Sequence, residues 1–181
     1  MSRWIILLRG INVGGHRKVP MNELKVALDH AGFEAIATYI QSGNVVLDDQ
    51  EESPSTVRER VAVAIQQRFG FDVAVIVRSA ADLTAVADSH HGDGLIDPKL
   101  LHVVFFSEVP SPDRRAALDV LAAEYAPDTW SYSGAGRELF VAYPDGSGRS
   151  KFGLDVVERT LGVTGTARNL NTVRRLIDLA Q

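Results

Sequence analysis

The order of apolar runs and amphipathic segments in the first 78 residues is the feature that most restricts the fold. The run Ile5-Ile6-Leu7-Leu8 is apolar on both faces of a strand, which indicates burial from both sides. The expected segments are 3–9 (strand), 20–31 (helix), 33–41 and 44–48 (strands), 53–69 (helix) and 71–77 (strand). This β-α-β-β-α-β order is that of a ferredoxin-like fold.

A similar order returns after a connecting segment. Ser79-Ala80-Ala81-Asp82 resembles a capping box that opens a short helix, and a polar loop follows over 88–99. The later segments are a strand over 101–106, a helix from 111, strands near 129–133 and 138–143, a helix over 151–161 and a last helix capped by Asn171. We therefore predict an α+β protein with two ferredoxin-like halves packed together, plus a C-terminal helix.

The expected division follows from these segments. Residues 1–78 form the first half, 79–99 the connecting helix and loop, and 100–181 the second half with the C-terminal helix. Because a ferredoxin-like sheet carries its helices on one face, strands that are apolar on both faces need a second cover. The other half of the chain can supply it, and a homodimer is the alternative.

Composition and charge restrict the partners. A net charge of -4 and a pI near 5.7 disfavour unspecific binding to long nucleic acid, although a local basic patch is compatible with both. The lack of cysteine excludes disulfides, thiolate catalysis and cysteine zinc sites, and suits a reducing cytoplasm. The N-terminal apolar run is too short to span a membrane. We expect a cytoplasmic protein with no membrane partner, metal or cofactor.

The segment between the first strand and the first helix has the composition of an anion site. Its glycines let main-chain N–H groups approach a ligand, its basic residues supply positive charge, and the next helix directs its positive dipole end to the same edge. It has neither the Lys-Ser/Thr ending of a P-loop nor the spacing of a dinucleotide fold. A glycine-rich turn with solvated charges is the alternative. The predicted ligand-binding residues here are Arg9, Gly10, Asn12, Gly14, Gly15, Arg17 and Lys18.

A second polar segment is expected at the same edge. In a ferredoxin-like fold the first and second strands run in the same direction, so their C-terminal ends share an edge. This places the glycine segment near the turn that contains Gln41, Ser42 and Asn44, whose polar groups can bind a ligand. Favourable turn chemistry alone also explains this turn.

These two segments also carry a resemblance to a known family. The stretches 8–15, 18–21 and 38–46 are similar to the bacterial family called domain of unknown function 1697, and 150–151, 166–169 and 171–173 extend the similarity over nearly the whole chain. The family pattern usually has tryptophan where this chain has Leu170, so no stacking role is expected there. The resemblance implies a ferredoxin-like fold with two subdomains, and it implies no activity.

Arg168 and Asn169 are two further predicted ligand-binding residues. They lie in what reads as a loop before the last helix, which is again favourable for an anion. The alternative is that Arg168 is a surface charge and that Asn169 or Asn171 only caps the helix.

No catalytic or metal motif stands out. His90 and His91 lack the spacing of a metal site and read as part of a solvated loop, and Ser42 is not on a G-x-S-x-G elbow. The expected strand over 44–48 offers Val45, Val46 and Leu47 where RNA-recognition domains present aromatic rings. Whether the protein is an enzyme is left open by the sequence.

Three functional hypotheses follow. The first is a protein that binds a small anionic ligand, a nucleotide or a phosphorylated metabolite, at the edge formed by 9–18 and 41–44. The second is a nucleic-acid-binding protein that grips phosphates with the same basic loop together with Arg168 and Arg174. The third is a non-enzymatic protein-interaction or dimerisation module in which the glycine motif is purely structural. We favour the first.

Overall fold

The chain folds into two compact units. The structure, a computed structural model, describes residues 1–51, 53–89 and 96–181, so the pair His90 and His91 lies outside the described residues. One unit comprises Met1–Leu83 and Arg175–Gln181, and the other comprises Thr84–Arg174. We call them the first and second unit.

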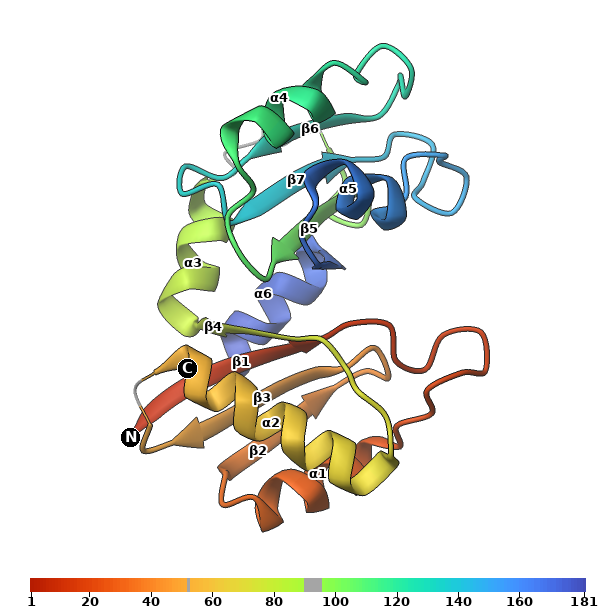
Figure 1. The fold of residues 1–181 in the computed structure, drawn as a ribbon. Helices are drawn as coiled ribbons and strands as arrows, with labels where there is room; N and C mark the ends of the chain where they lie inside the picture. The colour runs from red at the N-terminus through yellow and green to blue at the C-terminus, as the bar shows by residue number, and fades with distance from the viewer. Residues whose placement is uncertain (52, 90–95) are drawn as a thin grey trace. The chain divides into compact units, whose positions relative to one another are not determined.

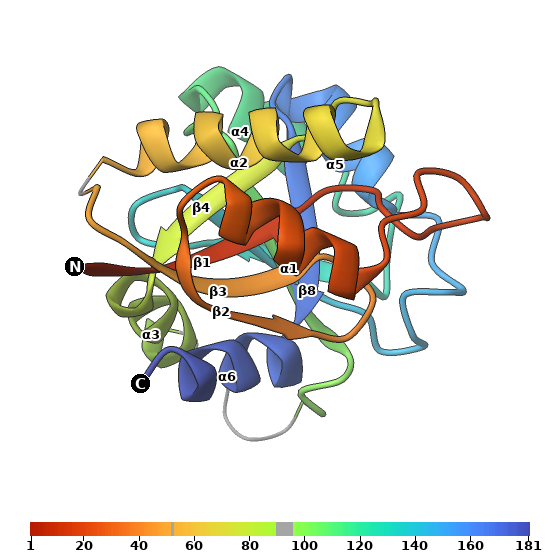
Figure 2. The same cartoon turned by 90° about the horizontal axis from the view of Figure 1, so that it is seen from below.

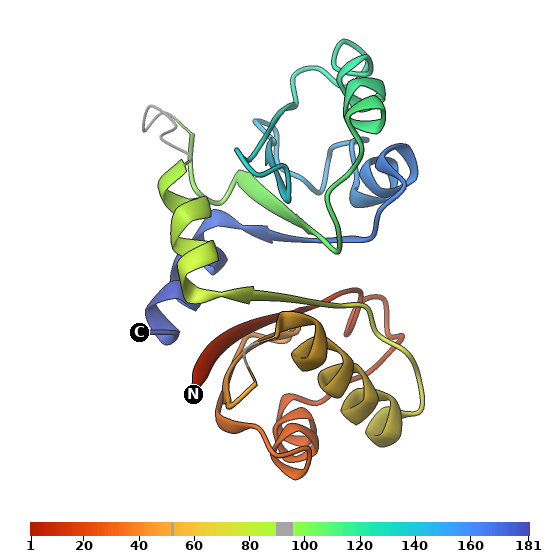
Figure 3. The same ribbon diagram turned by 60° about the vertical axis from the view of Figure 1, so that its left-hand side comes forward.

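The first unit is ferredoxin-like, as predicted. Its elements are β1 (Ser2–Leu8), α1 (Met21–His30), β2 (Glu34–Tyr39), β3 (Asn44–Asp49), α2 (Pro54–Phe69) and β4 (Val75–Ser79) (Figure 1). The strands form an antiparallel sheet in the order β2-β3-β1-β4. Helices α1 and α2 lie on the same face of this sheet (Figure 3).

Local signals fix the helix ends in this unit. The Ser53 hydroxyl accepts from the N–H of Thr56 at the start of α2, and Pro54 occupies the first helical position. Gly70 ends α2 with a positive φ of 77°, which glycine adopts without steric cost. These signals explain why the predicted and observed bounds of α2 nearly coincide.

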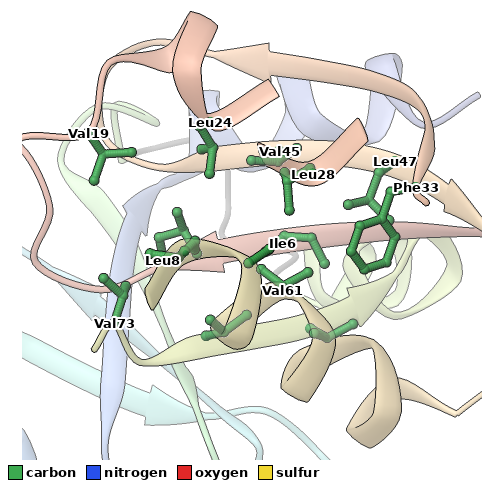
Figure 4. Close-up of a cluster of buried hydrophobic side chains, with 14 of the residues drawn as sticks. Ile6, Leu8, Val19, Leu24, Leu28, Phe33, Val45, Leu47, Val61 and Val73 are labelled. Carbon is green, nitrogen blue, oxygen red and sulfur yellow. The ribbon is translucent and has the colours of Figure 1, made fainter. Parts of the chain in front are cut away.

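The core of the first unit lies between the sheet and its two helices. Figure 4 shows it, with side chains from β1, β3, α1 and α2 pointing toward one another: Ile6, Leu8, Leu24, Leu28, Val45, Leu47 and Val61. All seven are at most 1% exposed. Val19, from the end of the glycine segment, is buried in the same core.

The strands are also buried on their other face. Ile5, Leu7, Val46 and Ile76 alternate with the core residues and are at most 2% exposed. Burial on both faces is what the continuous apolar run over residues 5–8 predicts.

The second unit repeats the same topology. Its elements are α3 (Ala80–Ser89), β5 (Leu101–Phe106), α4 (Pro112–Asp119), β6 (Thr129–Tyr132), β7 (Glu138–Ala142), α5 (Leu154–Leu161), β8 (Gly165–Asn169) and α6 (Leu170–Leu179), of which α3 and α6 continue into the first unit. The sheet order is β6-β7-β5-β8, again antiparallel. The predicted duplication is therefore confirmed and completed by β8.

Strand β8 is the main element that the sequence interpretation missed. Residues 165–169 were expected to form a loop, but Thr166 and Arg168 lie in a strand that pairs with β5, with Arg168 opposite Val103. The segment has few apolar residues, and its conformation is fixed by pairing with β5, whose Val103 lies 65 positions before Arg168. Such a long-range partner leaves no local pattern in the sequence.

Two boundaries differ from the predictions by three residues or more, and one helix cap also differs. Strand β4 begins at Val75 rather than at Phe71, and α5 begins at Leu154 rather than at Lys151. The side chain that caps α6 is Asn169, whose Oδ1 accepts from the N–H of Thr172 at 2.9 Å, and not Asn171. In contrast, the capping box of α3 forms as predicted, with reciprocal bonds between Ser79 and Asp82.

Candidate functional site

The ends of β1, β2 and β4 meet at one edge of the first unit. The N–H of Leu8 donates to the carbonyl of Gly43 at 2.8 Å, and the N–H of Arg9 donates to the carbonyl of Ala74 at 3.0 Å. The predicted proximity of the glycine segment to the turn over 41–44 is therefore confirmed. From here residues 10–18 extend away from the sheet before the chain enters α1 (Figures 1 and 2).

This glycine loop, residues 10–18, is closed at its base by Asn12. The side-chain amide of Asn12 donates to the carbonyls of Val19 at 3.0 Å and Gln41 at 2.8 Å, and its oxygen accepts from the N–H of Val19 at 2.8 Å. The N–H of Asn12 donates to the carbonyl of Arg17 at 3.1 Å. Asn12 therefore holds the two ends of the loop together and joins them to the neighbouring turn.

Two buried side chains anchor the loop on either side of this clamp. Ile11 is 2% exposed and Val19 is fully buried, and both belong to the core of the first unit. The residues between Asn12 and Val19 are all exposed. The loop thus has an exposed tip on a base that is anchored by two buried side chains.

The tip of the loop is a tight turn over Val13 to His16. The N–H of His16 donates to the carbonyl of Val13 at 3.2 Å, and Gly14 and Gly15 both have positive φ, as in a type I′ turn. Within the described part of the chain, the main-chain N–H groups of Gly14 and Gly15 have no acceptor. They remain able to donate to a ligand.

Positive side chains flank these amides. Arg17 and Lys18 follow the turn directly and are exposed, and neither side chain forms an ion pair or a hydrogen bond with any described residue. Arg9 is half-buried at the base of the loop. An anion at the tip would therefore meet main-chain donors and two cationic side chains.

The neighbouring turn is built around Asn44 and Gly43. Asn44 is fully buried, and its amide donates to the carbonyl of Tyr39 at 3.1 Å and to the hydroxyl of Ser42 at 2.9 Å. A Cβ on Gly43 would lie 2.7 Å from Cβ of Leu8. Asn44 therefore shapes the turn from inside, whereas Gln41 and Ser42 are exposed at the edge.

Unusual backbone conformations are concentrated at this edge. Among the described residues, four that are not glycine have a positive φ, and three of them, Asn12, Arg17 and Ile40, belong to the glycine loop or the adjacent turn. A positive φ is most unfavourable for a β-branched residue such as Ile40, whose side chain is also 52% exposed. Strain of this kind is frequent at ligand-binding sites.

The second unit shows that the fold itself does not require the loop. The N–H groups of Phe106 and Ser107 donate to the carbonyls of Arg137 and Thr164, which repeats the pattern made by Leu8 and Arg9. Yet only residues 107–111 connect β5 to α4, whereas residues 9–20 connect β1 to α1. The additional residues in the first unit are those of the glycine loop and its basic side chains.

Arg168 and Asn169 belong to the second unit and have structural partners there. Arg168 is buried in β8, and its Nη1 donates to the Thr166 hydroxyl at 2.8 Å and the Ala167 carbonyl at 2.7 Å. Burial lowers the pKa of Arg168 to about 10, so the guanidinium stays protonated at neutral pH. Asn169 caps α6, which was the alternative to a binding role.

The edge contains two apolar side chains that the sequence did not single out. Val13 at the loop tip is 68% exposed, and Ile40 beside Gln41 is 52% exposed. Apolar residues are uncommon inside turns, so their presence in the expected turns was the sequence signal that could have identified Val13 and Ile40. Val13 lies beside Gly14 at the tip of the loop, whereas Ile40 lies in the neighbouring turn.

The described residues contain neither a metal-binding cluster nor a helix that could span a membrane. Among them, no three side chains of histidine, aspartate or glutamate are arranged to hold a metal ion. None of the helices in the described ranges combines the length and apolar character that crossing a membrane requires.

The fold and this edge define a small α+β protein with two ferredoxin-like units and a basic glycine loop on the first. The sequence matches the family of proteins of unknown function DUF1697 over residues 1–136, and the chain belongs to this family. The conserved bacterial protein SP0830 from Streptococcus pneumoniae has a similar structure, with a TM-score of 0.78, 22% identity and 99% of each chain covered. At this identity the likeness shows the fold alone. None of the curated proteins compared with the chain matches it.

Proposed function

We propose that the protein binds a small anionic ligand, a nucleotide or a phosphorylated metabolite, at the edge formed by the glycine loop and the turn over 41–44. One observation carries the proposal: the duplicated unit makes the same connection with residues 107–111 alone. The extra length of 9–20 is therefore not a requirement of the fold. Within the described ranges, the amides of Gly14 and Gly15 and the side chains of Arg17 and Lys18 have no partner, and Asn12 clamps the base of the loop.

The chemistry of the edge favours phosphate over other ligands. The N–H groups of Gly14 and Gly15 can donate to phosphate oxygens while Arg17 and Lys18 neutralise their charge. Because Asn12 already fixes the base of the loop, little conformational entropy is lost on binding. Val13 and Ile40 offer contact area to a base or a carbon skeleton. The lack of cysteine supports the cytoplasmic location that is part of this proposal.

A nucleic-acid ligand would use the same donors and is the second candidate. The net charge of -4 opposes it, and a polymer needs a longer basic track than one loop provides. An interaction or dimerisation module is the third candidate, and the exposed Val13 and Ile40 would then contact a protein.

Removal of the two tip charges tests the proposal. We expect a thermal-shift screen with pyrophosphate, nucleotides, sugar phosphates and short oligonucleotides to find a ligand that stabilises the wild type by about 2.7 kcal/mol at a hundredfold excess over Kd. The double variant Arg17→Gln/Lys18→Gln should bind that ligand at least about tenfold more weakly, since hydrogen bonds to charged groups contribute about 1.5–3 kcal/mol each.

A matched double variant is the control. Lys25→Gln/Arg58→Gln removes the same charge from α1 and α2 and should leave the affinity unchanged. If both double variants bind the ligand equally weakly, the loss of affinity is due to the change in net charge and not to contacts at the loop tip. A preference for oligonucleotides, with an affinity that falls steeply as the salt concentration rises, would favour the hypothesis of a nucleic-acid-binding protein. No stabilising compound at all would favour the interaction module.

A further inference from the structure

A cavity of about 510 Å³ lies within the second unit. Its walls come from two segments: residues 124–128, which follow α4, and residues 145–151, which follow β7. The volume is in the range of small-molecule sites. Ser150 and Lys151 line this cavity and are not used by the site in the first unit.

A hydrogen-bonded pair joins the two walls. Asp128 is only 9% exposed, and its Oδ2 accepts a hydrogen bond from the Ser150 hydroxyl. The same hydroxyl accepts from the N–H of Phe152 at 2.8 Å. The carboxylate is thereby held at a fixed position in the cavity wall. Its other oxygen, Oδ1, accepts no hydrogen bond from any residue in the described ranges, so it can accept one from a ligand.

Aromatic side chains pack next to the part of the cavity wall that contains Ser150. The ring of Phe152 is fully buried, stacks on Trp130 with centroids 4.3 Å apart and lies 5.1 Å from the ring of Tyr125. The Tyr143 hydroxyl donates to the Phe152 carbonyl at 3.0 Å. Burial and the nearby Asp128 raise the pKa of Tyr143 to about 12, so this donor stays protonated at neutral pH.

Charges of both signs line the cavity. Arg149 and Lys151 are exposed, and their side chains form no ion pair or hydrogen bond within the described part of the chain. Glu124 and Asp145 are the other carboxylates. With Asp128 they are not arranged as a metal site, since no such cluster exists among the described residues. Cations beside the held carboxylate of Asp128 match a ligand that has an anionic group and a hydroxyl donor.

We propose that this cavity is a second binding site and that it takes a sugar phosphate. Arg149 and Lys151 contact the phosphate, Oδ1 of Asp128 accepts from a sugar hydroxyl, and the half-buried ring of Tyr125 lies against the carbon skeleton. The site does not depend on the glycine loop, because all its residues belong to the second unit.

Calorimetric titration of the full chain with ribose 5-phosphate tests this site. We expect binding in the millimolar range or tighter, weakened at least tenfold by Lys151→Gln and unchanged by Lys99→Gln, an exposed lysine outside the cavity. Ribose without the phosphate should bind at least tenfold more weakly. No binding by the wild type, or equal binding by the two lysine variants, would overturn the proposal.

Two further variants distinguish the sugar contact from the phosphate contact, and the cavity from the glycine loop. Asp128→Asn keeps an acceptor for Ser150 but removes the charge, so it should weaken ribose 5-phosphate at least threefold without weakening inorganic phosphate. Arg17→Gln/Lys18→Gln should leave ribose 5-phosphate binding intact. Binding that this double variant abolishes and Lys151→Gln retains would assign the ligand to the glycine loop and overturn the second site.

Discussion

Gly43→Ala is expected to lower the free energy of unfolding by about 2–4 kcal/mol. The cost has two sources, a steric clash of the new Cβ and the positive φ that alanine would have to adopt. Gly43 has a φ of 78°, and a new Cβ would lie 2.7 Å from Cβ of Leu8 and 2.9 Å from Cδ1 of Ile11. Cβ of Leu8 is fixed to the backbone of β1 and cannot move aside. The turn must therefore separate from β1, which strains the bond between the Leu8 N–H and the Gly43 carbonyl.

Gly15→Ala provides the matched control for this prediction. Gly15 has the same φ of 78°, but a Cβ there would meet no atom within 4 Å. Only the conformational cost remains, about 1–2 kcal/mol. Urea unfolding measures both changes as shifts in the midpoint at constant slope. Equal losses in the two variants would show that the contact between Gly43 and β1 is not tight.

Phe152→Ala is expected to destabilise the second unit by about 3–5 kcal/mol, the usual range for deleting a buried phenylalanine ring. Phe152 is fully buried and stacks on Trp130 at an interplanar angle of 12°. The contact with Tyr125 is also lost. Because the backbone of Phe152 is hydrogen-bonded to Ser150 and Tyr143, the wall of the cavity at Asp128 and Ser150 should loosen as well.

Phe71→Ala is the comparison for the second prediction. Phe71 is only partly buried at the margin of the first core, so its loss should cost less than half as much. Calorimetry on both variants, with Trp fluorescence to follow the surroundings of Trp130, gives the two values. Phe152 belongs to the hydrophobic core of the second unit, and a smaller cost for Phe152→Ala than for Phe71→Ala would contradict its importance there.

The elements of the first unit could be predicted because their signals are local. The apolar run over 5–8, the cap at Ser53 and the glycine at 70 each specify a nearby conformation. Strand β8 could not be predicted, since Arg168 adopts its conformation through pairing with Val103 on β5. The shared edge of β1 and β2 was predictable from topology alone, and the Asn12 to Gln41 hydrogen bond confirms it.

The roles of individual polar residues were harder to predict. Asn12 and Asn44 have the residue types of ligand contacts, yet their amides are used inside the protein to fix the loop and the turn. A sequence states what a side chain can bind but not which partner is nearest. The cavity at Asp128 and Ser150 was not predictable for the same reason, because it depends on a bond between residues 22 positions apart.

The central claim is that the glycine loop binds phosphate, and main-chain NMR tests it most directly. Pyrophosphate is titrated into ¹⁵N-labelled protein while the amide resonances are followed. We predict saturable shifts centred on Gly14, Gly15 and Lys18, and their loss in the Arg17→Gln/Lys18→Gln variant. No saturable shift in the loop, or shifts confined to residues such as Arg149 and Lys151, would contradict the claim.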